Sequence, residues 1–375
     1  MKARLMTVSV IAGLVMVLGL LVSITSAANV RPAREMNLTL GGEVYEVTPD
    51  TQGNLWLSEY SADRVWQVNW ATGAYTIYQG LPSASDARRD TAGDVWWADY
   101  DGGRLGRISL NTGTVTTWTL PGADSPWGIA FDDAGQVWIA DDDLPNVYSF
   151  NPTSTQVCTY TYDGSYSSYV LFHKGYLWLG DYGDAQVVRL DPVTNQFARW
   201  SLTSGASPYG LAMSSNDHLW WADKSGFLGC LEPTNNKVTT YTLPGGGEPA
   251  MVVPSGESVW YTEITGTFGV LNPSVVNEIS VTVVPSTKTV TPSCSVLGAG
   301  ISSSVSISTG MAVWSPAVIT ATVNSGGWQV YQLPSGANPW GIAAVGGSVW
   351  VADAGRDKLV WFSHRVYLPI VLRGQ

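Results

Sequence analysis

A tetrapeptide of the form Trp-x-[Ala/Ser/Thr/Gly]-[Asp/Glu] recurs along this chain and constrains its fold more than any other feature. The seven copies begin at Trp56, Trp96, Trp138, Trp178, Trp220, Trp260 and Trp350. Successive copies among the first six lie 40 or 42 residues apart. A repeat of about 40 residues with one aromatic residue and one acid at fixed places is typical of β-propeller blades.

The unit around Trp96 indicates how one repeat folds. Residues 95–99, 104–108 and 114–120 read as strands, and turn-forming Gly, Asn, Asp and Pro residues separate them. The segment 126–130, Pro-Trp-Gly-Ile-Ala, reads as the first strand of the next unit. Helical periodicity is absent from the sequence beyond its N-terminal leader. We therefore predict an all-β fold, a seven-bladed β-propeller of four-stranded blades.

The N-terminal segment is expected to close the ring. Residues 34–40 resemble the fourth strand of a blade, and they precede the first complete repeat. The last repeat, at Trp350, lacks such a strand of its own. Pairing the two would remove two open sheet edges, so we place the propeller at residues 34–365 with this closure.

One interval, the 90 residues between Trp260 and Trp350, breaks the period. Residues 279–326 within it are rich in Ser, Thr and Val, and we interpret them as an insertion in blade 6. The alternative is an eighth, degenerate blade around Trp314, which the position of Pro285 favours. Trp314 is followed by no acid, which favours seven blades.

Both ends of the chain differ from the repeats. Basic residues precede an apolar run over residues 5–24, and small residues follow it, so residues 1–28 read as a secretory signal peptide. The run is also long enough for a retained membrane anchor, which is the alternative. Residues 366–375 form a C-terminal tail. We predict a secreted or cell-surface protein.

The charge of the chain limits its possible binding partners, and its cysteine content limits disulfide and zinc sites. Acidic residues outnumber basic ones by 30 to 19, which gives a net charge of −11 and disfavours nucleic acid and anionic membranes. The odd set Cys158, Cys230 and Cys294 predicts neither a disulfide framework nor a zinc site, and pairing of Cys230 with Cys294 stays open. We expect a monomer that binds a small-molecule or protein ligand, with no membrane contact beyond the signal segment.

A ligand site is expected at one end of the central channel. In an antiparallel hairpin, the start of the first strand and the end of the second lie at the same end. Aromatic residues occupy the start of the first strand at Tyr45, Trp127, Tyr209 and Trp340, and the motif acids end the second strand. Such residues can stack on sugars, rings or cations.

Five motif acids are interpreted as structural. Each faces a polar residue five positions later across a four-residue turn. The acids and their expected partners are Glu59 with Arg64, Asp99 with Arg104, Asp141 with Asn146, Asp181 with Gln186, and Asp353 with Lys358.

The other two motif acids, Asp223 and Glu263, face Phe227 and Thr267 across shorter turns. Without a cation opposite them, they are the candidates for a ligand or metal contact at the channel mouth. The alternative is hydrogen bonding within their own turns.

The histidines are not placed for catalysis at that end. His173 and His218 precede the second strand of their blades, in turns at the opposite end, and His364 precedes the tail. The sequence therefore offers no histidine as a general base at the mouth.

The repeat Pro-x-Gly-Ile-Ala, Gly-x-Val-Trp-x-Ala-Asp, Arg-Leu-Gly-Arg-Ile closely resembles that of the virginiamycin B lyases, or streptogramin lyases. The resemblance covers about residues 34–362 apart from the insertion. It implies a seven-bladed propeller that opens a cyclic depsipeptide by elimination at its ester bond with a magnesium ion. At the positions that match the family's catalytic histidines, this sequence has Tyr209, Ala250 and Trp340. Two other positions keep the family's type of residue, a tyrosine at Tyr45 and an acid at Asp353.

Three functions follow from these observations. The first is a secreted propeller that binds a ligand or protein at its channel mouth without catalysis. The second is a metal-dependent lyase of the streptogramin type that uses carboxylates. The third is a cell-surface structural module whose work is done by the insertion and the tail.

Overall fold

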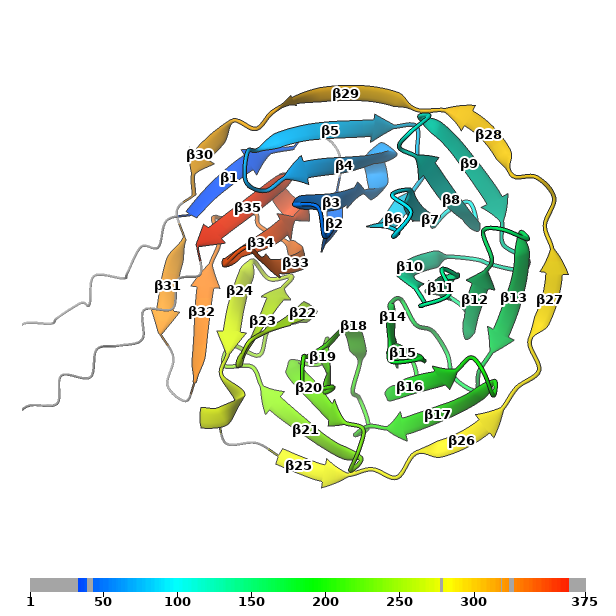
Figure 1. The fold of residues 1–375 in the computed structure, drawn as a ribbon. Helices are drawn as coiled ribbons and strands as arrows, with labels where there is room; N and C mark the ends of the chain where they lie inside the picture. The colour runs from blue at the N-terminus through cyan, green and yellow to red at the C-terminus, as the bar shows by residue number, and fades with distance from the viewer. Residues whose placement is uncertain (1–32, 39–42, 277–278, 318, 324–326, 364–375) are drawn as a thin grey trace, which may run out of the picture.

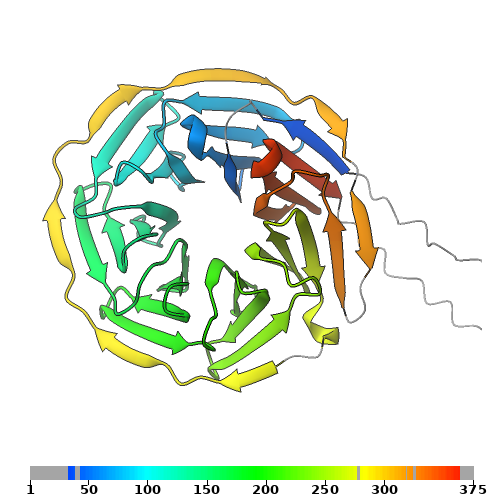
Figure 2. The same ribbon diagram turned by 180° about the vertical axis from the view of Figure 1, so that it is seen from behind.

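Seven β-sheets are arranged as blades around a central channel (Figure 1; Figure 2 from behind). The computed structural model describes residues 33–38, 43–276, 279–317, 319–323 and 327–363. The expected signal peptide and C-terminal tail lie outside these residues. Within them, no helix has the length and hydropathy that crossing a membrane requires.

Each blade contains four strands that run outward from the channel in the predicted order. The innermost strands are β2 (Val44–Pro49), β6 (Ala84–Arg89), β10 (Pro126–Phe131), β14 (Val170–His173), β18 (Pro208–Met213), β22 (Pro249–Ser255) and β33 (Pro339–Val345). The second strands, which carry the Trp motif, are β3 (Asn54–Glu59), β7 (Val95–Asp99), β11 (Val137–Asp141), β15 (Tyr176–Asp181), β19 (Leu219–Asp223), β23 (Ser258–Glu263) and β34 (Ser348–Asp353).

The third strands are β4 (Arg64–Asn69), β8 (Arg104–Ser109), β12 (Asn146–Phe150), β16 (Gln186–Asp191), β20 (Phe227–Glu232), β24 (Thr267–Leu271) and β35 (Lys358–Ser363). The fourth strands are β5 (Ala74–Gln79), β9 (Thr114–Thr119), β13 (Gln156–Thr161), β17 (Gln196–Ser201), β21 (Lys237–Thr242), β32 (Trp328–Gln332) and β1 (Ala33–Asn37). Three single 3₁₀ turns, η1 (Tyr60–Ala62), η2 (Pro273–Val275) and η3 (Ala354–Arg356), interrupt this pattern.

The motif tryptophans form the packing layer of the blades. All seven are at most 5% exposed. Several stack on an aromatic residue of the fourth strand, as Trp96 does on Trp118 at 5.8 Å between ring centroids. The indole N–H of Trp96 also donates to Asp90 at 2.8 Å, which ties the strand to the preceding turn. Burial of such a large side chain stabilises a core by several kcal/mol, so the repeat itself supplies the cohesion.

The N-terminal strand closes the ring as predicted. Strand β1 pairs antiparallel with β35, and Met36 lies opposite Leu359. The ion pair between Arg356 and Glu35 at 2.9 Å adds a contact between the two ends of the chain. Blade 7 is therefore assembled from the first and last strands of the propeller.

The segment between β24 and β32 forms a belt around the whole ring (Figure 1, yellow and orange). It adds a fifth, outermost strand to every blade. In chain order its strands are β25 (Ile279–Thr282) on blade 5, β26 (Ser286–Thr289) on blade 4, β27 (Ser293–Val296) on blade 3, β28 (Ile301–Ser304) on blade 2, β29 (Ser306–Met311) on blade 1, β30 (Trp314–Pro316) on blade 7 and β31 (Thr320–Val323) on blade 6. The belt thus visits the blades in the reverse of their order along the chain.

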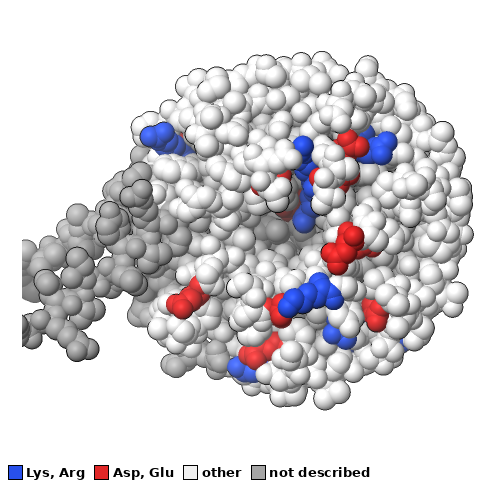
Figure 3. All heavy atoms as spheres, in the orientation of Figure 1, with Lys and Arg blue, Asp and Glu red and all other residues white. Residues whose placement is uncertain are grey.

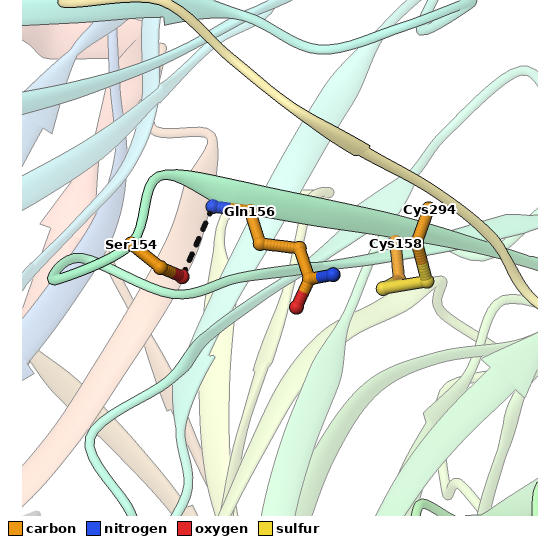
Figure 4. The surroundings of a disulfide bond; sticks show 4 residues. All are labelled: Ser154, Gln156, Cys158 and Cys294. Carbon is orange, nitrogen blue, oxygen red and sulfur yellow. Dashed lines mark hydrogen bonds between the residues drawn. A yellow bond between two sulfur atoms is a disulfide. The ribbon is translucent and has the colours of Figure 1, made fainter.

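Covalent and polar contacts hold the belt in place. Cys158 of β13 and Cys294 of β27 lie directly opposite each other and form a disulfide (Figure 4). Near it, the hydroxyl of Thr155 donates to the carbonyl of Leu297 at 2.6 Å. The third cysteine, Cys230, is buried within blade 5.

The prediction of seven blades is confirmed, and the alternative of an eighth blade around Trp314 is wrong. Trp314 belongs to belt strand β30, which pairs with β1. We expected four strands per blade, and each sheet has five because the belt adds one strand to it. Its strands are short and almost entirely exposed, so they show neither the alternation nor the large apolar residues that mark a blade.

Removing the disulfide should loosen the belt without destroying the propeller. The bond joins residues 136 positions apart, and cross-links that close such long loops typically stabilise by about 2–5 kcal/mol. We expect the double variant Cys158→Ser/Cys294→Ser to melt several degrees lower in calorimetry and to be cut by protease first within residues 279–323. Wild-type protein treated with reductant should behave like the variant. Unchanged melting and proteolysis in both samples would contradict a stabilising role for the bond.

Candidate functional site

The innermost strands begin at the end of the channel where the motif acids lie. Pro126 pairs with Asp141, and Pro208 pairs with Asp223. The register shifts directly after each of these prolines, so the next residue lies in a β-bulge. A bulge redirects a side chain out of the regular alternation of a strand. In both strands the redirected residue is aromatic.

This arrangement brings the four predicted aromatic residues together. The ring centroid of Tyr45 lies 5.7 Å from that of Trp127 and 5.2 Å from that of Trp340. The ring of Trp340 lies 6.0 Å from that of Tyr209. All three pairs meet edge to face, which is a favourable geometry for aromatic rings. Trp127 and Tyr209 are buried, and the other two are partly exposed.

A second set of residues, which the sequence analysis missed, completes this surface. They occupy the position directly after a motif acid. The ring of Tyr60 lies 6.0 Å from Tyr45 and 5.6 Å from Tyr100, and the ring of Tyr182 lies 5.6 Å from Tyr209. We define the channel mouth as the following residues: Tyr45, Tyr60, Tyr100, Trp127, Tyr182, Tyr209, Lys224 and Trp340. Reading each repeat one residue further would have identified them.

Lys224 is the cation of the mouth. It follows Asp223 in the turn between β19 and β20, and its Nζ lies 3.3 Å from the ring centroid of Tyr209. The rings of Tyr182 and Trp340 are each 5.5 Å from the same atom. Burial lowers the pKa of Lys224 to about 8, although the nearby carboxylates oppose that shift. The ammonium is therefore held mainly by aromatic faces.

Carboxylates accept hydrogen bonds from the tyrosines of the mouth. Tyr182 donates to Asp142 at 2.9 Å, and Tyr45 donates to Glu43 at 2.6 Å. Burial raises the pKa of Asp142, while hydrogen bonds from Ser168 and Tyr182 oppose the shift. Figure 3 shows acidic and basic side chains gathered around the central depression on a face that is otherwise largely uncharged.

Below the aromatic rings lies a second group of charged residues. Glu46 is 1% exposed and accepts a hydrogen bond from Tyr169, which reaches it from blade 4. Arg88 pairs with Asp86 at 2.8 Å in the neighbouring blade. Burial, together with repulsion from Asp86, raises the pKa of Glu46 to about 8. Glu46 is thus a buried acid that holds its proton near neutral pH.

Three of the five turn acids have the partners expected from the sequence. Glu59 lies 2.7 Å from Arg64, and Asp99 lies 2.5 Å from Arg104. The carboxylate of Asp181 accepts a hydrogen bond at 2.8 Å, and the donor is the expected Gln186. Burial raises the pKa of all three acids against the effect of these partners.

The other two turn acids have different partners. The expected contact of Asp141 with Asn146 is wrong: its carboxylate accepts from the hydroxyl of Tyr148 at 3.1 Å and from backbone N–H groups of the preceding loop. The chain enters blade 3 close to this carboxylate, so backbone donors satisfy it.

Asp353 departs from expectation in a similar way. It pairs with Arg356 at 2.6 Å rather than with Lys358. The turn η3 brings Arg356 back over the acid, and Lys358 instead lies 3.3 Å from Glu35.

Asp223 and Glu263 do not extend unpartnered into the mouth. Asp223 accepts from the backbone of Ser207 at 2.8 Å and from the hydroxyl of Ser225 at 2.5 Å, so hydrogen bonding within its own turn region replaces the missing cation. It lines a cavity of about 220 Å³ bounded by β20, β21 and the belt strand β25. Glu263 is 4% exposed and lies against the backbone of Gly247, where a side chain would collide with its Oε2.

A metal site at these two acids does not fit the geometry. Within the described residues, no three His, Cys, Asp or Glu side chains lie together in a way that could hold a metal ion. The hydrogen bonds of Asp223 already use much of its capacity as a ligand. We therefore derive no chemistry through magnesium at this site.

The described histidines lie away from the mouth. His173 ends β14, and its Nε2 lies 2.7 Å from Asp217 in the corresponding turn of blade 5. His218 directly precedes β19 and contacts Asn216 at 3.3 Å. Both lie at the turns between first and second strands, opposite the aromatic end. His364 lies outside the described residues.

Fold and site together define a seven-bladed β-propeller with an aromatic channel mouth. The profile of the virginiamycin B lyase family matches residues 32–293, so the chain belongs to that family. This match includes the first six repeats and the start of the belt. A comparison with curated protein sequences finds no match.

Solved structures give the same fold at low sequence identity. The virginiamycin B lyase of Staphylococcus aureus is 17% identical with a TM-score of 0.66, over 88% of this chain and 98% of that one. A streptogramin B lyase is 18% identical with a TM-score of 0.70, over 91% and 100% of the two chains. An extracellular domain of a one-component system from B. thetaiotaomicron is 12% identical with a TM-score of 0.56, over 86% of this chain and 41% of that one.

The buried acid below the mouth predicts a pH-dependent stability. Below about pH 4.5 Glu46 is protonated in the folded and unfolded chains alike. Between pH 4.5 and 8 the folded protein keeps a proton that the unfolded chain releases, so this group lowers the free energy of unfolding as pH rises. We expect Glu46→Gln to melt at least about 2 °C above wild type at pH 8 and equally at pH 4.5. The exposed Glu43→Gln serves as control, and equal effects of the two variants at pH 8 would contradict this account.

Proposed function

We propose that this protein is an exported propeller that binds a ring-bearing organic ligand at its channel mouth and releases it unchanged. The observation that carries this proposal is the chain of aromatic contacts from Tyr60 through Tyr45 and Trp340 to Tyr209. These residues come from three blades, with Tyr45 and Tyr60 in blade 1, Trp340 in blade 7 and Tyr209 in blade 5. Tyr45 and Trp340 remain partly exposed at the channel, where a ligand can reach them.

The described residues of the mouth include no histidine to act as the base of the lyase reaction. An elimination next to an ester requires a base that removes a proton from carbon. A catalytically inactive histidine-to-alanine variant of the S. aureus enzyme was crystallised with quinupristin. By resemblance, the strand starts of the family's histidines correspond here to Tyr209, Ala250 and Trp340, and the acid Glu46 is buried.

Export is supported by two independent features. The apolar segment over residues 5–24 has the length and flanking residues of a secretory signal. The disulfide between Cys158 and Cys294 belongs to an oxidising compartment, because such bonds are rare in the cytosol. A cell-surface structural module whose work is done by the insertion has less support, because the strands of the insertion pair with the outer edges of this protein's own seven blades.

Binding without turnover can be tested with quinupristin. We expect its addition to quench tryptophan fluorescence of the wild-type protein, and mass spectrometry to find no ring-opened product with or without magnesium. Trp340→Ala and Tyr45→Ala should each weaken binding about tenfold or more, because each removes a ring that the ligand contacts.

Trp361→Ala is the matched control. Trp361 is also partly exposed but lies on β35 beside Arg34, away from the channel, so its loss should leave binding unchanged. Ring-opened quinupristin would show catalysis and contradict the proposal. Affinity that is indifferent to both mouth variants would contradict the location of the site.

A further inference from the structure

We propose that Tyr182, Tyr209 and Trp340 form a cage for an organic ammonium group, and that Lys224 occupies this cage as an internal cation that the ligand displaces. This inference rests on the proposed function and specifies the chemistry of the ligand at the same mouth.

The geometry of the cage is that of a cation site. The three rings surround the Nζ atom of Lys224 at 3.3, 5.5 and 5.5 Å from their centroids. The rings also contact one another, with 5.6 Å between Tyr182 and Tyr209 and 6.0 Å between Tyr209 and Trp340. Aromatic faces within about 6 Å attract cations, and sites for quaternary ammonium groups are built in this way.

Charge around the cage favours a cation over an anion. The nearby carboxylates of Asp142 and Glu248 both favour the charged form of Lys224. Asp142 also accepts the hydroxyl hydrogen of Tyr182 at 2.9 Å, which makes that ring more electron-rich. A ligand with a carboxylate or phosphate at this place would meet repulsion from the same groups.

Lys224 is poorly suited to remain in the cage permanently. Its ammonium has three hydrogen-bond donors and is strongly hydrated in water, but the aromatic faces offer no strong acceptor. In the part of the chain that the structure describes, no carboxylate lies within ion-pairing distance of its Nζ. A methylated ammonium has no N–H groups to satisfy and would lose less hydration on entering.

The position of Lys224 allows it to leave. It lies in the turn between β19 and β20, next to the exposed Ser225, and it is itself partly exposed. The stem of a lysine is flexible, so its ammonium can move out to solvent while the rings of Tyr209 and Trp340 stay fixed by their β-bulges. The lysine thus competes with a ligand for the cage and lowers its apparent affinity.

The cage can be tested by titrating the mature chain with tetramethylammonium chloride. A parallel titration with sodium chloride matches the ionic strength. Calorimetry and tryptophan fluorescence should show weak binding to wild type and binding about tenfold or more tighter to Lys224→Ala, because the competing cation is gone. Lys224→Arg keeps a cation and should stay as weak as wild type. The double variant Lys224→Ala/Trp340→Ala should lose the gain.

A neutral isostere separates charge from shape. Neopentane-like alcohols such as 3,3-dimethyl-1-butanol match choline in size, and Lys224→Ala should bind choline at least about tenfold more tightly than this alcohol. Melting temperatures establish that each variant is folded. Equal affinity of wild type and Lys224→Ala for tetramethylammonium, or equal affinity for choline and its isostere, would overturn the cage. If only the cage is wrong, Trp340→Ala would still lose quinupristin binding. Failure of the cage can therefore be told apart from failure of the proposed function.

Discussion

The structure depends on the pairing of sheet edges at the circumference of the ring. A blade of four strands leaves its outermost backbone groups unpaired, and such an edge can join another sheet. Here β1 completes blade 7, and the belt then covers the fourth strand of every blade. The new outer strands have only three to six residues each, and five of the seven contain or adjoin Pro or Gly, which makes them poor templates for further pairing. Once the rim is covered, the packed tryptophans between blades hold the channel in one shape.

This rigid frame explains how a variable surface arises at the mouth. The motif acid is fixed by hydrogen bonds or ion pairs in its own turn, as Asp99 is by Arg104. The next residue has no such role and is free to differ between blades, so it is Tyr60 in one repeat and Lys224 in another. The repeat therefore separates the residues that hold the fold from those that meet a ligand. Two positions in each blade, this one and the start of the first strand, set the chemistry of the mouth.

The parts of the fold that could be predicted are those with a local signal. The Trp motif, its spacing and the turn residues predict the seven blades, and the strand-like residues before the first repeat predict the closure. The belt could not be predicted because its pairing partners are remote and its strands carry mostly Ser and Thr with no buried face. At the site, contacts across a turn followed from register, as for Glu59 and Arg64. The partners of Asp141 and Asp353 depend on how loops fold back over the acid, which spacing alone does not specify.

The course of the belt has a consequence for the order in which the molecule is made. During synthesis blades 1 to 5 emerge before the belt, and the first belt strand finds its partner in the most recently completed blade. Each later strand of the belt reaches further back, until β29 joins β5 at the beginning of the chain. Blade 6 is completed only when β32, which follows the belt in the chain, pairs with β24. We therefore expect the belt to pair first with the blades synthesised last and then with those synthesised earlier. In a molecule whose belt has not finished pairing, the C-terminal blades rather than the first ones are incomplete.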